Sequence, residues 1–331
     1  MKMNSSNENH EKLQRIIEQL IAAKRVLIFP HIFMDGDCLG SSVAICNMLR
    51  QMGKEAYVLI EDDIPLNLKF LNTKFCTWTK DILMDIDLSL AIDCSDEERL
   101  GSRLECFFSA KQTASIDHHV TNQCFAQMNY TDDHAGATGE IIFEVFQRLG
   151  NGIKMDMVIA EALYTAIVTD TGNFQYTNTT AKTHIIVSKL LEFGIDLEKI
   201  SVELYQNSRY EKIAMNAAVL NTLEMFCNGK ANFAYATQDM YERIGASLDE
   251  TEGVIENLRN IRGIEISAFF KENKGDEIKV SFRAKTYGDV SKIAQKFGGG
   301  GHKKAAGCTL HTSLKEAIVL VKEEICAEME S

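Results

Sequence analysis

One short segment concentrates side chains that could bind a metal. The segment HIFMDGDCLGSS, residues 31–42, places His31, Asp35 and Asp37 directly after the apolar run at 26–30. The apolar run predicts a short buried strand, so these three side chains would lie where that strand leaves the core. An imidazole and two carboxylates in one turn are donors that a divalent cation prefers.

Three later segments end in the same kinds of side chain. LSLAIDCSDEE carries Asp93 just past an apolar run, TASIDHHVTN carries Asp117, His118 and His119 past another, and AIVTDTGNFQYTN carries Asp170 after a predicted helix. Asp93 alone would be interpreted as a helix cap, and any single ending as a solvated turn. Four such endings together indicate a metal site. Histidine with several aspartates, without paired cysteines, suits Mn²⁺.

The elements expected to position these residues alternate along the first half of the chain. Apolar runs predict strands at 26–30, 57–60, 88–92 and 113–116, and helical periodicity predicts helices at 10–23, 41–52, 138–149, 157–168 and 181–193. This alternation predicts an α/β fold with a doubly wound, mainly parallel sheet. Such sheets bind ligands beyond the carboxyl ends of their strands, which is where the acidic and histidine residues fall.

The remainder of the chain predicts a second, smaller α/β domain with a mixed sheet. A long helical tract is expected at about 197–227, followed by strands at 231–237, 265–271 and 277–285 and helices at 251–258, 290–297 and 313–329. The segment KENKGDE predicts a hairpin turn. We therefore expect domains at 1–195 and 229–331, joined by a helical linker at 196–228.

Composition restricts the class of protein. The chain has 331 residues, enough for about two domains, and a net charge of −12 from 35 Lys and Arg against 47 Asp and Glu. Proteins that bind long nucleic acid over their whole surface are usually basic, so an anionic ligand here would need a local site. Nine cysteines without a C-x-x-C pair argue against a disulfide framework and a zinc ribbon. The polar start and the lack of a long apolar run predict a cytoplasmic protein without a membrane partner.

A glycine-rich segment, KFGGGGHKKAAG at 296–307, leaves two interpretations open. Such runs are commonly flexible linkers. Here the glycines follow a predicted helix and precede His302 and small residues, so their backbone N–H groups could converge on an anion, which we favour. The larger aromatic residues are expected in the core rather than as base-stacking platforms: Trp78, Phe107, Phe108, Phe269 and Phe270.

Taken in order, the motifs HxxxDGDxxGS, DCSD, DHH and TDTGxF resemble the DHH phosphoesterase superfamily, and FGGGGHKKAAG resembles its DHH-associated substrate-binding domain. The resemblance covers nearly the whole chain. It is strongest to the bacterial oligoribonuclease and pAp-phosphatase group, the nanoRNases. Met34 is a departure, because this group often has proline there; the change affects loop rigidity and removes no ligand.

The resemblance implies a site for two Mn²⁺ ions, with Mg²⁺ or Co²⁺ as alternatives. One ion would be held by His31 and Asp35, the second by Asp37, His118 and Asp170, with Asp93 bridging both and serving catalysis. Two such ions would activate a hydroxide for in-line attack at phosphorus.

Two neighbouring residues are expected to support this chemistry. Asp117 would orient a ligand histidine from the second layer of contacts. His119 is either a structural hydrogen-bonding residue or a catalytic donor to the phosphoryl oxygens or the leaving group, and we favour the donor.

The resemblance also implies substrate-binding residues in the second domain: Gly299, Gly300, Gly301, His302 and Arg283. The arginine would contact the far phosphate of the substrate, because a guanidinium binds phosphate through two hydrogen bonds. Its alternative is a surface charge on an edge strand. Arg259 and Arg262 stay open between surface charge and ligand contact.

The implied activity is that of a Mn²⁺-dependent phosphohydrolase. Acting as an exonuclease, it would cleave short oligoribonucleotides to mononucleotides, and it would also dephosphorylate pAp. One alternative is hydrolysis of pApA or cyclic di-AMP. Inorganic pyrophosphatase activity is disfavoured by the GGGGH segment, and a metal-stabilised RNA-binding module without turnover is disfavoured by the complete ligand set. Long duplex nucleic acid is not an expected partner, and the oligomeric state is open, with a homodimer as one option.

Overall fold

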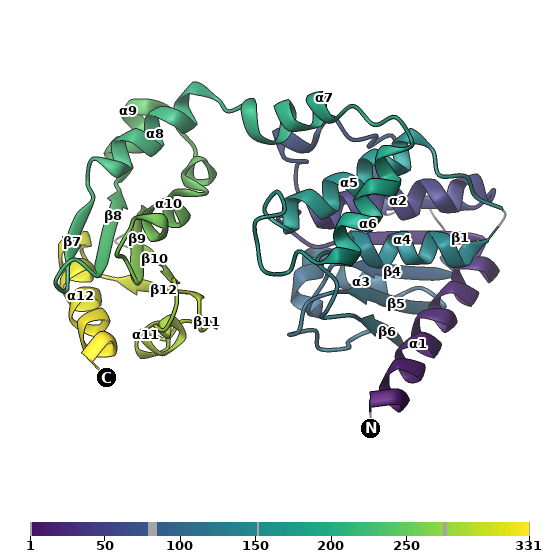
Figure 1. The fold of residues 1–331 in the computed structure, drawn as a ribbon, viewed down its shortest axis with the longest axis horizontal. Helices are drawn as coiled ribbons and strands as arrows, with labels where there is room; N and C mark the ends of the chain where they lie inside the picture. Colours follow the sequence, from purple (N-terminus) through teal and green to yellow (C-terminus); the bar gives the residue numbers. More distant parts are fainter. Residues whose placement is uncertain (1, 79–84, 151, 274–276, 331) are drawn as a thin grey trace. The chain divides into compact units, whose positions relative to one another are not determined.

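The structure is a computed structural model that describes residues 2–78, 85–150, 152–273 and 277–330. The chain forms two compact units, Met1–Asn207 and Ser208–Ser331, called the first and second unit below. Each unit has its own sheet (Figure 1). The boundary falls inside the segment predicted as a linker.

The first unit contains a six-stranded parallel sheet with the order β3-β2-β1-β4-β5-β6. The strands are β1 (Arg25–Pro30), β2 (Glu55–Leu59), β3 (Cys76–Thr77), β4 (Leu88–Ile92), β5 (Gln112–Asp117) and β6 (Met128–Thr131). This confirms the predicted doubly wound α/β class. The strand order reverses between β1 and β4, and such a switch point is where open α/β sheets bind ligands.

Helices cover both faces of this sheet. One face packs against α1 (Lys2–Ala22), α2 (Gly36–Gln51) and α4 (Thr138–Leu149), and α5 (Met157–Asp170) and α6 (Ala181–Leu191) pack on these helices. The other face packs against η3 (Glu97–Arg103) and α3 (Leu104–Phe108). Because apolar residues of the strands contact both layers, the sheet is buried on both sides, as parallel sheets are.

Helix α2 begins at Gly36, earlier than the predicted start at 41, because the Asp35 side chain caps it by accepting a hydrogen bond from the backbone N–H of Cys38 at 3.0 Å. Helices α2 and α5 then pack closely at Gly40, where an added Cβ would lie 2.4 Å from the backbone oxygen of Ala162. This contact fixes the N-terminus of α2 beside the C-terminus of α5, where Asp170 lies.

The segment predicted as a helical linker contains several elements. Helix α7 (Leu197–Ser201) runs into a π-helical turn, η4 (Val202–Gln206), and α8 (Tyr210–Leu220) follows in the second unit. The end of the segment predicted as helical contains a short strand, β7 (Glu224–Phe226). Helix therefore stops at Leu220, before the predicted end at 227.

The second unit has a six-stranded sheet with the order β11-β12-β10-β9-β8-β7. The sheet is mixed, as predicted: β8 and β9 pair in parallel, and the other neighbouring strands pair antiparallel. Its other elements are β8 (Ala231–Ala236), α9 (Gln238–Ile244), η5 (Leu248–Thr251), α10 (Val254–Asn260), β9 (Ile266–Asn273), β10 (Glu277–Ala284), α11 (Val290–Lys296), β11 (Gly300–His302), β12 (Ala305–His311) and α12 (Leu314–Glu330). Strands β9 and β10 pair as a hairpin would, but 274–276 of the predicted turn lie outside the described residues.

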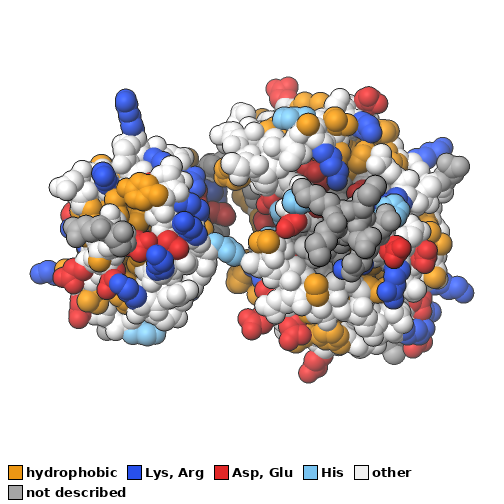
Figure 2. All heavy atoms as spheres, turned by 60° about the horizontal axis from the view of Figure 1, so that its bottom comes forward, with side chains coloured by type: hydrophobic (Ala, Val, Ile, Leu, Met, Phe, Trp, Pro, Cys, Tyr) orange, Lys and Arg blue, Asp and Glu red, His pale blue; other side chains and the backbone are white. Residues whose placement is uncertain are grey.

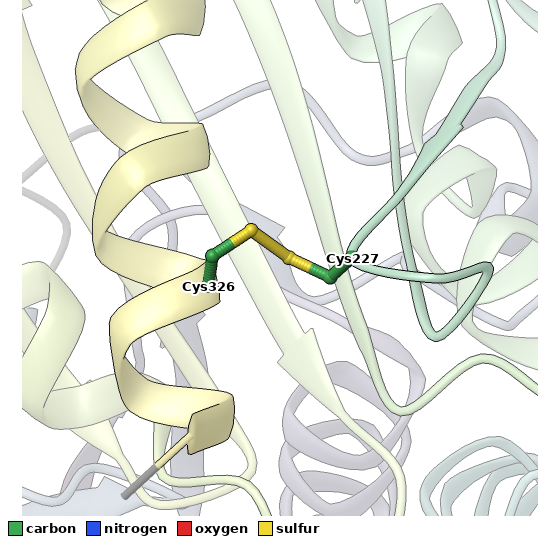
Figure 3. Close-up of a disulfide and its surroundings, with 2 residues drawn as sticks. All are labelled: Cys227 and Cys326. Carbon is green, nitrogen blue, oxygen red and sulfur yellow. A yellow bond between two sulfur atoms is a disulfide. The ribbon is translucent and has the colours of Figure 1, made fainter.

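One covalent feature differs from expectation. Cys227, after β7, and Cys326, on α12, form a disulfide with their Cα atoms 5.8 Å apart (Figure 3). The cysteine spacing argued against a disulfide framework, and this single bridge corrects that expectation. Four other cysteines behave as small buried side chains, as expected: Cys38, Cys46, Cys94 and Cys308.

The aromatic predictions divide in two. Phe107, Phe269 and Phe270 are buried, as expected, whereas Trp78 and Phe108 are 54 % and 46 % exposed, which corrects their assignment to the core. Among the helices that the structure describes, none is long and apolar enough to cross a membrane.

Candidate metal centre and catalytic site

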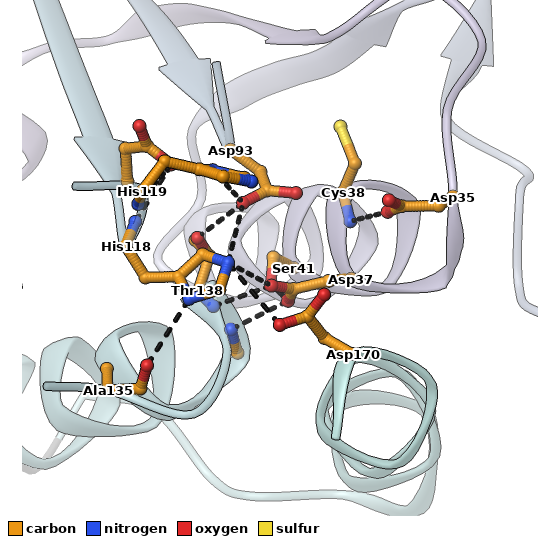
Figure 4. Close-up of polar contacts among 12 residues, drawn as sticks. Asp35, Asp37, Cys38, Ser41, Asp93, His118, His119, Ala135, Thr138 and Asp170 are labelled. Atoms are coloured by element: carbon orange, nitrogen blue, oxygen red, sulfur yellow. Dashed lines mark hydrogen bonds and ion pairs between the residues drawn. The ribbon is translucent and has the colours of Figure 1, made fainter. Parts of the chain in front are cut away.

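Six predicted metal ligands meet at the switch point of the first sheet, and Figure 4 labels all of them except His31. The turn after β1 supplies His31, the start of α2 supplies Asp35 and Asp37, the turn after β4 supplies Asp93, the turn after β5 supplies His118, and the end of α5 supplies Asp170. Four chain segments far apart in sequence thus converge because the carboxyl ends of parallel strands lie along one edge.

Asp93 lies between the two histidines. Its Oδ2 atom is 3.8 Å from His31 Nε2, and its Oδ1 atom is 3.7 Å from His118 Nε2. His31 Nε2 also lies 3.7 Å from Asp35 Oδ2, and His118 Nε2 lies 3.8 Å from Asp37 Oδ2. The arrangement therefore has two halves that share one carboxylate. Asp170 Oδ2 belongs to the second half, 3.4 Å from His118 Nε2.

The two imidazoles are oriented alike. His31 Nδ1 contacts the carbonyl oxygen of Ile32 at 2.8 Å, and His118 Nδ1 contacts that of Ala135 at 3.3 Å. Because a carbonyl oxygen only accepts, each Nδ1 donates a proton to it, and the Nε2 atom of each ring faces the carboxylates. The Nε2 atom of His118 is buried and makes no hydrogen bond within the described part of the chain. A cation would satisfy this atom, so the donor set fits a metal.

The carboxylates are crowded as well as buried. Asp37 and Asp93 are 1 % and 2 % exposed. Burial, followed by the charges of Asp93 and Asp170, raises the pKa of Asp37 well above its usual range. Burial likewise raises the pKa of Asp93, and it raises that of Asp170 to about 6. Like charges held this close are stable together only with positive charge between them, which is a second physical reason to expect a cation.

The backbone at Asp93 is itself unusual. Its φ angle is +61°, in the left-handed region that non-glycine residues rarely adopt. The turn brings the carboxylate back toward Thr138, whose Oγ1 donates to Asp93 Oδ1 at 2.8 Å. Outliers of this kind concentrate at functional sites, where surrounding contacts hold them in place.

Sequence reasoning missed the residues that hold Asp37. The backbone N–H groups of Thr138 and Gly139, at the start of α4, donate to the two carboxylate oxygens at 2.6 and 2.9 Å, and Ser41 Oγ donates at 3.0 Å. The only signals available were the predicted helix start at 138 and the serine of the HxxxDGDxxGS motif. Neither indicates that the start of one helix contacts the start of another.

Asn178 holds the other side of the site. Its Nδ2 donates to the carbonyl oxygens of Gly136 and Asp170 at 2.8 and 3.1 Å and lies 3.3 Å from Asp170 Oδ2. The side chain thereby ties the end of α5 to the loop before α4. Cys38 was also missed: its thiol joins His31 and Asp93 in a group that could hold a metal. However, its Sγ already accepts the N–H of His31 at 3.1 Å.

Asp117 and His119 form a separate pair beside the six ligands. Asp117 is fully buried, and its Oδ1 accepts from His119 Nδ1 at 2.7 Å and from the backbone N–H of His118 at 2.8 Å. Its Oδ2 accepts from Asn122 Nδ2 at 2.7 Å. Asp117 therefore orients the imidazole of His119. With His118, Asp117 contacts only the backbone.

The Asp117 contact also sets the charge of His119. Its hydrogen bond to Asp117 raises the pKa of His119 to about 9. The side chain of His119 is 41 % exposed, whereas that of His118 is 11 % exposed. His119 is thus the histidine of this pair that a substrate in the site can reach.

The predicted substrate-binding residues lie together in the second unit. Arg283 on β10 pairs in register with Ala305 on β12, which pairs with His302 on β11, so Arg283 and His302 stand in one row across three strands. The guanidinium is partly engaged, because Arg283 Nε donates to Glu256 Oε1 at 3.0 Å. Figure 2 shows Lys and Arg side chains on this unit interspersed with Asp and Glu, so positive charge here is local.

The glycines of this segment have a packing reason of their own. Gly300 and Gly301 belong to β11, and Gly299 immediately precedes it. An added Cβ at Gly299 would lie 2.2 Å from the backbone oxygen of Gly307, and at Gly301, whose φ is +139°, 2.5 Å from the Cα of Ala306. Only glycine lets these strands approach so closely. The segment is therefore an ordered strand and turn rather than a flexible linker.

Comparison with known proteins agrees with this architecture. Residues 25–167 match the DHH family N-terminal domain, and residues 230–329 match the DHHA1 domain. The chain is 30% identical over 325 residues to a bifunctional oligoribonuclease and PAP phosphatase, NrnA, of Thermus thermophilus, covering 96% of this chain and 95% of that protein. It is 26% identical to the Bacillus subtilis protein of the same name, covering 92% and 96%.

A solved structure shows the same fold. The crystal structure of an exopolyphosphatase-related protein from Bacteroides fragilis superposes with a TM-score of 0.89 at 22% identity, covering 97% of this chain and 98% of that one. A parallel sheet with carboxylates and imidazoles at its switch point, followed by a mixed-sheet unit, is the architecture of a two-unit phosphoesterase. The chain belongs to the DHH family and is a hydrolytic phosphoesterase.

Proposed function

We propose that the protein hydrolyses short oligoribonucleotides to mononucleotides and removes a phosphate from pAp, using divalent cations of which Mn²⁺ is the preferred one. The observation that supports this most is the two-part arrangement in which Asp93 faces both His31 Nε2 and His118 Nε2. The named activity of the relatives in Thermus thermophilus and Bacillus subtilis supports the substrate class.

We propose that two divalent ions occupy the site. His31 and Asp35 would hold one, Asp37, His118 and Asp170 would hold the other, and Asp93 would contact both. Bound divalent cations supply Lewis-acid polarisation of the phosphoryl group and a nucleophile at neutral pH. Mn²⁺ suits this set of oxygen and imidazole donors, and Mg²⁺ and Co²⁺ remain alternatives.

The chain's own residues would handle orientation and protons. Asp117 holds the ring of His119 through Nδ1, so the ring can present an N–H at Nε2. In the proposed reaction this proton goes to a phosphoryl oxygen or to the leaving oxygen as the bond to phosphorus breaks. Thr138 and Ser41 keep Asp37 and Asp93 in place, so that the site is organised before substrate binds.

The second unit would bind a phosphate of the substrate. Arg283 and His302 stand in one row, with the glycine segment 299–301 next to His302, and this arrangement suits a phosphate if Arg283 exchanges Glu256 for it. Short oligonucleotides and pAp carry more than one phosphate, whereas a simple phosphate monoester carries one.

A substrate panel tests the proposal. With Mn²⁺, wild-type protein is offered pAp, a two-nucleotide and a five-nucleotide RNA, pApA, cyclic di-AMP and pyrophosphate. Release of phosphate, mononucleotide or linear dinucleotide is measured with and without a chelator. We expect chelator-sensitive turnover of pAp and the dinucleotide. Rapid hydrolysis of pyrophosphate with inert nucleotides, or faster turnover of cyclic di-AMP or pApA than of pAp and RNA, would contradict the assignment.

A further inference from the structure

An exposed aromatic residue lies in the turn that carries two of the candidate metal ligands. Phe33 lies two residues after His31 and two before Asp35, and it is 77 % exposed, the highest value among the described aromatic residues of the first unit. His31 and Asp35 are both candidate metal ligands. A large aromatic ring that stays in solvent leaves most of its apolar surface free to contact a ligand.

The backbone fixes this exposure. Phe33 has a φ angle of +55°, and a bulky residue in this region is an outlier. Its N–H donates to Asp62 Oδ2 at 2.6 Å, and the N–H of Ile32 donates to the carbonyl oxygen of Arg99 at 2.8 Å. Met34, the next residue, is buried at 3 % exposure. The turn is thus anchored on both sides of Phe33, and the strained residue is the one whose ring faces solvent.

Three other exposed aromatic residues of the first unit differ from Phe33, because each has a contact within the fold. Tyr176 lies over Gly172, where an added Cβ would meet its ring at 2.4 Å, and the hydroxyl of Tyr205 donates to Val168 O at 3.4 Å. Phe108 packs edge-on against Phe107, with ring centroids 5.1 Å apart. Phe33 forms no aromatic pair within the described residues, so its ring is available to a ligand.

We propose that Phe33 is a stacking platform for a nucleobase of the substrate whose phosphate lies at the candidate metal centre. The inference rests on the proposed nucleotide substrate and adds a residue that would select it over other phosphate esters. Stacking on an aromatic ring tolerates every base, because each base has a π face, so Phe33 would favour a nucleotide without selecting its sequence.

The experiment compares ligands with and without a base. Phosphate release is measured for pAp and for its abasic analogue, in which hydrogen replaces adenine, and calorimetry in the presence of Mn²⁺ measures binding of AMP and of ribose 5-phosphate. Phe33→Asn removes the ring but keeps a residue that tolerates positive φ, and Phe33→Trp keeps a ring. Phe108→Ala is the matched control, an exposed phenylalanine at the end of α3, the helix that precedes the amino end of β5.

For Phe33→Asn we expect kcat/KM on pAp and affinity for AMP to fall about 5- to 100-fold. For this variant, kcat/KM on the abasic analogue and affinity for ribose 5-phosphate should change less than twofold. Phe33→Trp should keep wild-type kcat/KM on pAp and wild-type affinity for AMP. Equal losses on both kinds of ligand, or no loss, would overturn the stacking role. Absence of pAp turnover in the wild-type protein would contradict the proposed function, whereas wild-type pAp turnover that Phe33→Asn leaves unchanged would overturn the stacking role alone.

Discussion

Each unit holds a buried carboxylate in a cradle of backbone N–H groups, yet the two carboxylates differ in pKa. Asp37 in the first unit accepts from Thr138 and Gly139, and burial with the neighbouring aspartates raises its pKa. Glu265 in the second unit is also buried, but hydrogen bonds from Gly288, Thr286 and Tyr287 outweigh the effect of burial, so its pKa lies below the usual range.

The difference comes from the surroundings of the two cradles. Asp93 and Asp170 crowd Asp37 with like charge, whereas the contacts that dominate at Glu265 are N–H and O–H donors. A cradle of donors that satisfies its carboxylate completely is a structural device, because it fixes a turn. A cradle that leaves a carboxylate crowded is suited to binding a cation. The comparison assigns cation binding to the carboxylate of the first unit and a structural role to that of the second. The predictions below test that difference.

The largest effect is expected from Asp93→Ala. Loss of the shared carboxylate should remove at least one bound ion and abolish turnover, a loss greater than the 10²–10⁴-fold typical of removing a general acid. Metal content by elemental analysis and turnover of pAp are measured on the same sample. Asp156→Ala is the control, because Asp156 caps the opposite end of α5 from Asp170. Two bound ions with near-normal turnover in the Asp93 variant would contradict the site.

His119→Ala should come next. The variant should keep its metal and lose turnover by about 10²–10⁴-fold, because the residue is exposed to substrate and oriented by Asp117. Asp117→Asn should give a smaller loss, since the ring remains but its orientation is less constrained. Metal content tests the assignment of His119 outside the ligand set: a variant that loses one ion would show that His119 is a metal ligand rather than a donor.

The sequence predicted the candidate metal ligands but not the residues that hold them in place. His31, Asp93, His118 and Asp170 could be predicted because each follows an apolar segment that ends at the same edge of the sheet. The residues that position them could not. Thr138 and Asn178 contact the site through helix and loop packing, which no local pattern records.

The second unit was harder to predict for a physical reason. Its sheet is mixed, and β11 is a strand of three residues that is defined by its pairing with β12, which in turn pairs with β10, rather than by an apolar pattern of its own. The disulfide joins Cys227 and Cys326, which are 99 residues apart, so no spacing rule could have found it. The glycines at 299 and 301 were predicted from anion binding, and their packing role emerges only from the paired strands.

Arg283→Ala tests whether the second unit contributes more than shape. It should weaken kcat/KM on pAp and dinucleotides by about 2–5 kcal/mol, because a desolvated contact to the far phosphate is lost. A small activated phosphodiester without a second phosphate should be hardly affected, since remote binding energy acts on catalysis only when the remote group is present.

The matched control for Arg283 is Lys279→Ala, a cation four residues earlier on β10 whose side chain is 57% exposed. We expect it to leave both substrates within about twofold. Equal losses on the two substrate types in the Arg283 variant would show that this arginine supports the fold of the second unit, where it pairs with Glu256.

Removing the disulfide should affect only the second unit. Cys326→Ser should lower its free energy of unfolding by about 2–4 kcal/mol, because the bridge closes a long loop between the turn after β7 and α12. The protein has one tryptophan, Trp78 in the first unit, so its fluorescence follows the first unit while far-UV circular dichroism follows both. Cys124→Ser, an exposed cysteine of the first unit, is the control. A parallel fall in the tryptophan transition would show that the units do not unfold separately.

The smallest expected effect is the pH dependence contributed by Glu265. Because its folded pKa lies below its ordinary value of 4.5, its contribution to stability is fully present above about pH 4.5 and is lost as the pH falls through the lower folded pKa. Glu265→Gln should therefore cost about 1–3 kcal/mol at pH 7 and remove this acid-side slope, since an amide cannot supply the charge that strengthens the bonds from Gly288 and Thr286. Denaturant unfolding by circular dichroism between pH 3 and pH 7 measures both effects, with Glu323→Gln on the exposed side of α12 as the control. If the glutamine variant kept the wild-type slope, another carboxylate would hold the turn, and the contrast with Asp37 would reflect burial alone.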